Sequence, residues 1–187
     1  IALFDSYLAD GGGLVALVDP TPLSELGNEE DTLVAYLAES WGVLLDDNLI
    51  VDPSSNPPSD AVAYSYAEHP ITQKMNNVAA YFPFARSMQF VENKNLTQTL
   101  LAWTIDRAWG ESNFSALEVD GDPVAFDEED DIPGPLAMAS SVENISTGGR
   151  IVVFGNAVFA GDEAFDAYGN GDLFINAIDW AAEQEDL

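Results

Sequence analysis

The stretch RIVVFGNAVFAGDEAFDAYGNGDLFINAIDWAAE, residues 150–183, contains the clearest strand, loop and helix of the chain in direct succession. Residues 151–154 form an uninterrupted apolar run that stops at Gly155, which is typical of a strand buried on both faces in a parallel sheet. From about Asp172 apolar residues recur at helical spacing, so we expect a helix that packs on the sheet along one stripe. Asn170 or Asp172 is expected to cap its first turn.

The remaining apolar segments extend this order of elements toward the N-terminus. Residues 1–8 have helical spacing and precede a run of three glycines, after which residues 14–18 form a second buried-strand candidate that ends at Asp19. A further helix is expected over residues 32–41, closed by Gly42. Helices and strands in this order indicate α/β layers. The other strand candidates lie at 43–45, 49–51, 61–66, in two pieces within 79–91, at 97–104 and at 136–142, whereas 121–135 is an acidic, proline-punctuated loop.

Ligands of open α/β sheets bind beyond the carboxyl ends of the strands. Asn156 follows the strand at 151–154 almost directly, and the loop after it leads to the predicted helix. The alternative is that Gly155 and Asn156 only turn the chain, since no partner motif accompanies them. The candidate ligand-binding residues are Asp19, His69, Asn156, Asn170 and Asp172.

Enzymatic chemistry has little support in the sequence. The chain contains no cysteine, which excludes disulfides, thiolate metal sites and cysteine nucleophiles. A serine hydrolase needs a histidine base, but the single histidine, His69, precedes Pro70 in a predicted turn, and no G-x-S-x-G motif occurs. A structural role for His69 is therefore favoured over the role of a base or a metal ligand.

No cofactor and no metal site is predicted. The glycines at 11–13 precede a strand, whereas a phosphate-binding loop follows one, and the segment after Gly155 lacks the lysine of a P-loop. The acidic runs at 120–131 and 162–172 offer oxygen ligands for calcium without the spacing of an EF-hand loop. Solvated charge is the favoured interpretation of both runs, and calcium binding is left open.

The charge of the chain restricts its partners. It carries 33 acidic and 5 basic residues, a formal net charge of −28, which argues against binding to nucleic acid or to an anionic membrane surface. A salt-rich setting, an extracytoplasmic location or a cationic partner would each fit this charge. At 187 residues and 47% hydrophobic composition, we expect a single domain over residues 1–187, and no apolar run is long enough to span a bilayer.

Taken in order, several segments resemble the GldG-like gliding-motility auxiliary family of ABC-type transport systems, whose soluble domain is also similar to a domain of intraflagellar-transport proteins. The resemblance spans nearly the whole chain and depends on the order and spacing of its motifs. These are YLADGGGLVALVDP from Tyr7, WGVLLDDNLIVDP from Trp41, EHPIT from Glu68, GPLAMA from Gly134, RIVVFGNAVF from Arg150 and NGDLFINAIDWAAE from Asn170.

This resemblance implies both a fold and a role. The implied fold is a three-layer α/β sandwich with a mostly parallel central sheet, flavodoxin-like or class I glutamine amidotransferase-like. The implied role is that of a non-enzymatic extracytoplasmic domain, anchored to the membrane by segments outside these residues, which binds membrane components of an ABC transporter, another protein or a ligand. The alternatives are a hydrolase-like enzyme of the amidotransferase-like superfamily and a structural module for complex assembly.

We predict that the folded protein is more stable at moderate ionic strength than at very low salt. Counterions screen the repulsion among its carboxylates, most of which have no basic partner because 33 acidic residues face 5 basic ones. Melting temperatures measured across a sodium chloride series test this. A melting temperature that fell as salt was added would contradict the prediction.

Overall fold

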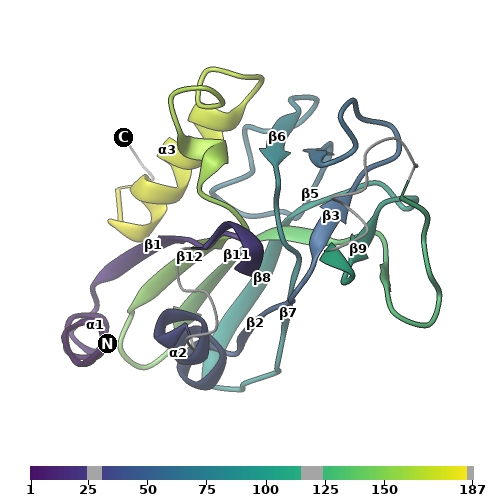
Figure 1. The fold of residues 1–187 in the computed structure, drawn as a ribbon. Helices are drawn as coiled ribbons and strands as arrows, with labels where there is room; N and C mark the ends of the chain where they lie inside the picture. The colour runs from purple at the N-terminus through teal and green to yellow at the C-terminus, as the bar shows by residue number, and fades with distance from the viewer. Residues whose placement is uncertain (25–30, 115–123, 185–187) are drawn as a thin grey trace.

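The computed structural model describes residues 1–24, 31–114 and 124–184. These residues form three α-helices and twelve β-strands, so the protein is mostly β (Figure 1). The helices are α1 (Ala2–Ala9), α2 (Thr32–Trp41) and α3 (Asn170–Ala181). The expected three-layer, flavodoxin-like or amidotransferase-like α/β sandwich with a mostly parallel central sheet is therefore wrong.

A mixed, curled sheet of seven strands forms the centre of the protein. Its main path runs β1–β12–β11–β8, and in this path β1 and β12 are parallel while the other neighbours are antiparallel. β7 joins β11 at the single pair Ala137 and Met88, β2 pairs with β7, and β5 pairs with the end of β8. The seven strands are β1 (Gly13–Leu17), β2 (Val43–Leu45), β5 (Ser65–Tyr66), β7 (Met88–Phe90), β8 (Leu96–Trp103), β11 (Ala137–Asn144) and β12 (Arg150–Phe154).

Two smaller antiparallel sheets flank the main sheet. One contains three strands in the order β10–β9–β3, and the other is the pair β4 and β6. These strands are β3 (Leu49–Val51), β4 (Asp60–Ala63), β6 (Ala80–Pro83), β9 (Trp109–Glu111) and β10 (Ile132–Pro133).

The prediction of a parallel sheet fails because the described residues between α2 and α3 contain no α-helix. A parallel neighbour requires a long crossover connection, usually a helix, whereas strands joined by short loops pair antiparallel. β11 and β12 are joined in this way by residues 145–149. The apolar run at 151–154 is buried because both faces of the sheet are covered, and this condition does not depend on strand direction.

The side chains of β12 alternate between two hydrophobic clusters, one on each face of the sheet. Val152 and Phe154 belong to the cluster that α3 covers, and Ile151 and Val153 belong to the cluster that α1 and α2 cover. Figure 1 shows α3 on one side of the sheet and α1 and α2 on the other. Since both of its faces are buried, β12 is the centre of the fold.

Several predicted elements are confirmed. The helix at 32–41 and the strands at 43–45 and 49–51 have the expected bounds, and Gly42 ends α2 in the left-handed conformation with φ of 65°. The helix expected at 1–8 is α1, which buries only Leu8.

Other local predictions are wrong or incomplete. Gly169 is the N-cap residue of α3, which has no side-chain cap, so neither Asn170 nor Asp172 caps the helix. The acidic loop predicted at 121–135 lies partly outside the described residues, and its described end contains β10. No apolar run in the sequence predicts β9.

Phe159 joins the connection after β12 to the core. Its buried ring stacks on Phe154 and on Phe82, with ring centroids 4.5 Å and 5.0 Å apart. We predict that Phe159→Ala lowers the free energy of unfolding by about 3–5 kcal/mol, because the ring leaves a cavity that its neighbours cannot fill. The control Phe126→Ala removes a ring that is 43% exposed and should cost less than about 1 kcal/mol. Equilibrium urea unfolding measures both, and equal losses would contradict the prediction.

Candidate functional site

Two of the predicted site residues, Asp19 and Asn156, lie together at the carboxyl ends of the parallel strands β1 and β12. The backbone N–H of Ala157, the residue after Asn156, donates to Asp19 Oδ1 at 2.7 Å. This hydrogen bond joins the loop after β12 to the end of β1.

The guanidinium of Arg86 lies beside this pair and is only 4% exposed. Its Nε donates to the carbonyl of Asp46 at 2.7 Å, Nη1 to the carbonyl of Asp19 at 3.3 Å, and Nη2 to the carbonyl of Leu45 at 3.4 Å. The cation thus binds the strand ends through backbone oxygens. Burial lowers the pKa of the guanidinium, and the carboxylates of Asp47 and Asp46 oppose this effect.

A network of short side chains surrounds the carboxylate of Asp46. Ser87 Oγ donates to Asp46 Oδ2 at 2.6 Å, and Gln89 Nε2 donates to Asp46 Oδ1 at 2.7 Å. Asn48 Nδ2 donates to Ser87 Oγ at 2.8 Å, and its Oδ1 accepts from the Ser87 backbone N–H at 3.0 Å. These groups bind one another, so the network holds the ends of β2 and the start of β7 in place.

Asn156 and Asn170 both hold β6 through their side-chain amides. Asn156 Nδ2 donates to the Pro83 carbonyl at 2.8 Å. Asn170 Oδ1 accepts from the Tyr81 N–H at 2.7 Å, and its Nδ2 donates to the Tyr81 carbonyl at 2.8 Å and to the Phe159 carbonyl at 3.1 Å. Both asparagines are fully buried, which gives them a positioning role in the fold.

Gly155 does more than turn the chain. Its N–H donates to the Met138 carbonyl and its carbonyl accepts from the Arg86 N–H, so it joins β12 to β11 and to the segment before β7. A Cβ at this position would collide with the backbone oxygen of Arg86. The glycine is required by this close approach of two backbones.

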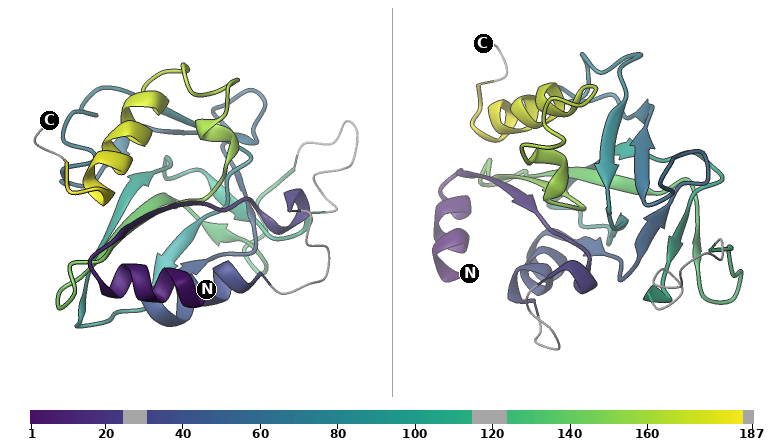
Figure 2. Two further views of the ribbon diagram at one scale, coloured as in Figure 1. Left: turned by 90° about the vertical axis from the view of Figure 1, so that its left-hand side faces the viewer. Right: turned by 45° about the horizontal axis from the view of Figure 1, so that its top comes forward.

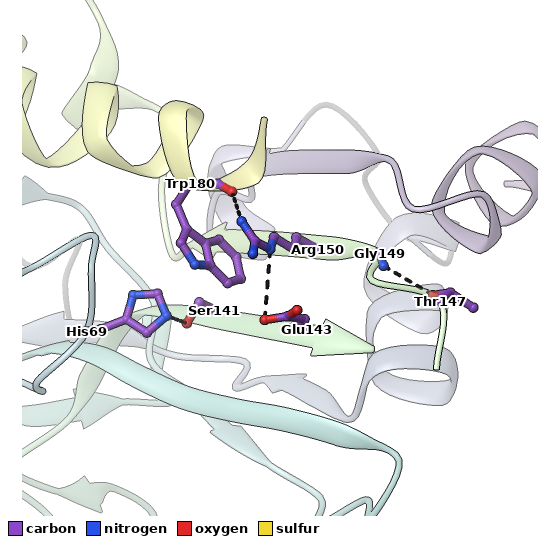
Figure 3. Close-up of polar contacts among 7 residues, drawn as sticks. All are labelled: His69, Ser141, Glu143, Thr147, Gly149, Arg150 and Trp180. Carbon is purple, nitrogen blue, oxygen red and sulfur yellow. Dashed lines mark hydrogen bonds and ion pairs between the residues drawn. The ribbon is translucent and has the colours of Figure 1, made fainter. Parts of the chain in front are cut away.

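The remaining candidates lie apart from this cluster. Asp172 is exposed in the first turn of α3, where the partial positive charge of the helix terminus favours a carboxylate. His69 lies above β11, and its Nε2 is 3.2 Å from the Oγ of Ser141 (Figure 3). The edge of its ring also contacts Trp180, with centroids 5.0 Å apart.

Trp180 links His69 to a charged pair on β11 and β12 (Figure 3). The Arg150 guanidinium lies 4.9 Å from the centre of a Trp180 ring, and Nη1 donates to the Trp180 carbonyl at 2.8 Å. Arg150 Nε is 3.8 Å from Glu143 Oε2. These contacts attach the end of α3 to the sheet.

The hydrogen bonds of His69 indicate which ring nitrogen carries the proton, and this tautomer does not suit a base for Ser141. The backbone N–H of Ile71 donates to His69 Nδ1 at 3.2 Å, so the neutral ring carries its proton on Nε2. Nε2 then donates to Ser141 Oγ, whereas a base must accept the serine proton. Ser141 is also almost fully buried. In this tautomer the Ser141 hydroxyl accepts from His69, and the pair ties the turn at His69 to β11.

The described residues offer no metal centre. Within residues 1–24, 31–114 and 124–184, no three histidine, aspartate or glutamate side chains are grouped as a metal site requires. In the described part of the acidic loop, the carboxylate of Asp127 accepts from Glu129 N–H and that of Asp131 accepts from Asp127 N–H. In the same residues no helix is long and apolar enough to cross a membrane.

Sequence reasoning did not find two surface features. A groove of about 430 Å³ lies beside β5 and the end of β8 and is lined by Tyr64, Trp103, Asp106 and Arg107, among others. The second feature is a set of exposed apolar side chains on two helices, Leu3, Phe4 and Tyr7 of α1 and Ile175 and Ile178 of α3. The helical spacing of residues 1–8 predicts the helix, but it does not show which of its apolar residues stay exposed.

Comparison with known proteins establishes similarity of fold. Neither a protein-family model nor a curated protein sequence matches the chain. The solved structure of the mmIFT52 N-terminal domain is similar, with a TM-score of 0.67 and 13% sequence identity over 96% of this chain and 69% of that chain. At this identity the similarity shows the fold alone. The resemblance to the GldG-like family stays a prediction, because this similarity neither supports nor opposes it.

We predict that Arg86→Met lowers the free energy of unfolding by about 3–5 kcal/mol, because it leaves the backbone carbonyls of Asp19, Leu45 and Asp46 buried without this donor. The matched control Arg107→Met changes an exposed arginine and should change stability by less than about 0.5 kcal/mol. Equilibrium urea unfolding measures both variants. A stable Arg86→Met protein would show that the guanidinium does not hold the strand ends.

Proposed function

We propose that this protein is a non-enzymatic binding domain that docks a partner protein. The observation that carries the proposal is the set of exposed apolar side chains on α1 and α3, which we call the apolar margin and define as Leu3, Phe4, Tyr7, Ile175 and Ile178. Leu3 is 85% exposed and Tyr7 is 57% exposed, values that are costly for large apolar groups in water. These side chains come from two helices that cover opposite faces of the main sheet, and exposed apolar side chains that cluster on a surface mark interaction sites.

The polar centres support binding over catalysis. The hydrogen bonds of Arg86, Asn156 and Asn170 go to backbone groups of neighbouring strands, and His69 donates to Ser141 instead of accepting its proton. A hydrolase needs a base that accepts the proton of its nucleophile. The hydrolase alternative is therefore disfavoured, and a binding or assembly module is the better proposal.

We further propose, from the sequence resemblance, that the domain acts as an extracytoplasmic auxiliary of an ABC-type transport system of the GldG-like kind. Its partner would then be a membrane component of that transporter, reached through segments that anchor the domain to the membrane. A net charge of −28 is compatible with a cationic partner on that side of the membrane. A structural module for complex assembly is a second candidate, which also follows from the sequence resemblance.

We predict that the immobilised domain captures a membrane component of an ABC-type transporter from detergent-solubilised membranes of its own cells. The double variant Leu3→Ser with Ile178→Ser should reduce this capture about tenfold or more, because each buried leucine or isoleucine contributes about 1.5–3 kcal/mol to an interface. Quantitative mass spectrometry of the captured proteins measures the change.

The matched control is Tyr64→Ser. Tyr64 is 67% exposed and precedes β5, on the side of the main sheet opposite β1, so its loss should leave capture unchanged. Equal capture by the unmodified domain, the Leu3→Ser, Ile178→Ser variant and the Tyr64→Ser variant would contradict a role for the apolar margin. Ester hydrolysis by the unmodified protein that is lost in Ser141→Ala would contradict the non-enzymatic proposal.

A further inference from the structure

The strand β1 forms one edge of the main sheet, and its outer backbone groups have no partner within the described residues. β1 pairs only with β12 there, in parallel, with Gly13 opposite Arg150 and Leu17 opposite Phe154. Arg150 N–H donates to the Gly12 carbonyl and Val18 N–H donates to the Phe154 carbonyl. In a parallel ladder alternate residues bond to the same neighbour, so the N–H and carbonyl groups of Gly13, Val15 and Leu17 point to the open side.

The strand is only partly covered. Gly13, Leu14, Val15 and Leu17 are half-buried, whereas Ala16 and Val18 are buried. Lysine, proline and charged residues usually prevent an edge strand from pairing with a further strand, and Gly13–Leu17 contains none of them. The left view of Figure 2 shows β1 at the front, with α3 above it and α1 below it.

Two residues of the apolar margin, Ile178 and Tyr7, lie on the two sides of this open edge. Trp180 of α3 contacts His69, which binds Ser141 of β11, so Trp180 points toward β11. Ile178 is two residues away in the helix and therefore points to the opposite side. Because the sheet order is β1–β12–β11, that opposite side lies over β1 and beyond it. On the other face the ring of Tyr7 rests against Gly12, directly before β1.

The charge around the edge has one sign. Residues 1–19 and 170–181, which contain α1, β1 and α3, include no lysine and no arginine, and their aspartates are Asp5, Asp10, Asp19, Asp172 and Asp179. Arg150, which is paired with Gly13 across the ladder, contacts Trp180 and Glu143. A second copy of this chain would bring a further charge of −28 to the same place, which disfavours it as the occupant.

We propose that the open edge of β1 binds an extended, lysine- or arginine-bearing segment of the partner protein, which adds to the main sheet as a further strand. The outer groups of Gly13, Val15 and Leu17 supply the backbone hydrogen bonds, the apolar margin contacts alternate side chains of the segment, and the flanking aspartates attract its basic residues. This inference rests on the proposed function and names the binding mode and the chemistry of the partner.

The test uses a peptide of alternating lysine and valine as the probe, a peptide of alternating glutamate and valine as its control, and the variant Val15→Pro. Proline removes one outward N–H without removing a bond to β12, and an edge strand accepts its backbone angles. The matched variant Val15→Ala loses similar packing and keeps the N–H. We expect Val15→Pro to weaken binding of the lysine–valine peptide about tenfold or more, and Val15→Ala to change it less than about threefold.

Hydrogen exchange followed by NMR tests the same point in the unmodified protein, so the result does not depend on how well a variant folds. The lysine–valine peptide should slow exchange of the Gly13, Val15 and Leu17 amides, bind more weakly as salt is added, and bind more tightly than the glutamate–valine peptide.

Several outcomes would overturn the inference. These are no binding of the lysine–valine peptide, equal binding of both peptides, protection of amides elsewhere, or an unchanged affinity in Val15→Pro. Dimerisation of the unmodified protein that is lost in Val15→Pro would identify a second copy as the occupant instead. Transporter capture that survives Val15→Pro but fails in the Leu3→Ser, Ile178→Ser variant would leave the proposed function intact and overturn strand addition alone.

Discussion

The buried guanidinium of Arg86 is the interaction that holds the carboxyl ends of β1, β2 and β12 together. It binds the carbonyls of Asp19, Leu45 and Asp46, while its own backbone N–H donates to Gly155. One residue of the connection between β6 and β7 therefore joins the ends of β1, β2 and β12. A buried cation is expensive without compensation, and here carbonyl dipoles and nearby carboxylates provide it. The position that receives ligands in open parallel sheets is occupied by the protein itself.

The sequence predicted local elements better than their arrangement. The helix at 32–41 and the strands at 43–45 and 49–51 follow from apolar spacing and from Gly42, which are local signals. Strand direction depends on connections and partners distant in sequence, so the run at 151–154 indicated burial correctly and a mostly parallel sheet wrongly. Figure 1 shows that β12 lies between β1 on one side and β11 on the other.

The candidate site could be predicted only in part. Asp19 and Asn156 were predicted as ligand-binding residues, and in the structure the side chain of Asn156 holds β6 while the carboxylate of Asp19 holds the loop after β12. Arg86 gave a signal in the sequence, since it is a lone charge within the apolar segment 79–91. Its carbonyl partners were not predictable, because they belong to segments that approach it only in the folded chain. The tautomer of His69 likewise depends on the N–H of Ile71 and the position of Ser141.

The pairing of β1 with β12 has a consequence for the order of folding. Gly13 meets Arg150, so β1 leaves the ribosome long before the strand with which it pairs. Until β12 is synthesised, both sides of the apolar segment Gly13–Leu17 remain open. The absence of proline and of charged residues in this strand leaves the edge open in the folded protein. In the nascent chain the same composition favours pairing with other chains until β12 or a chaperone covers the strand.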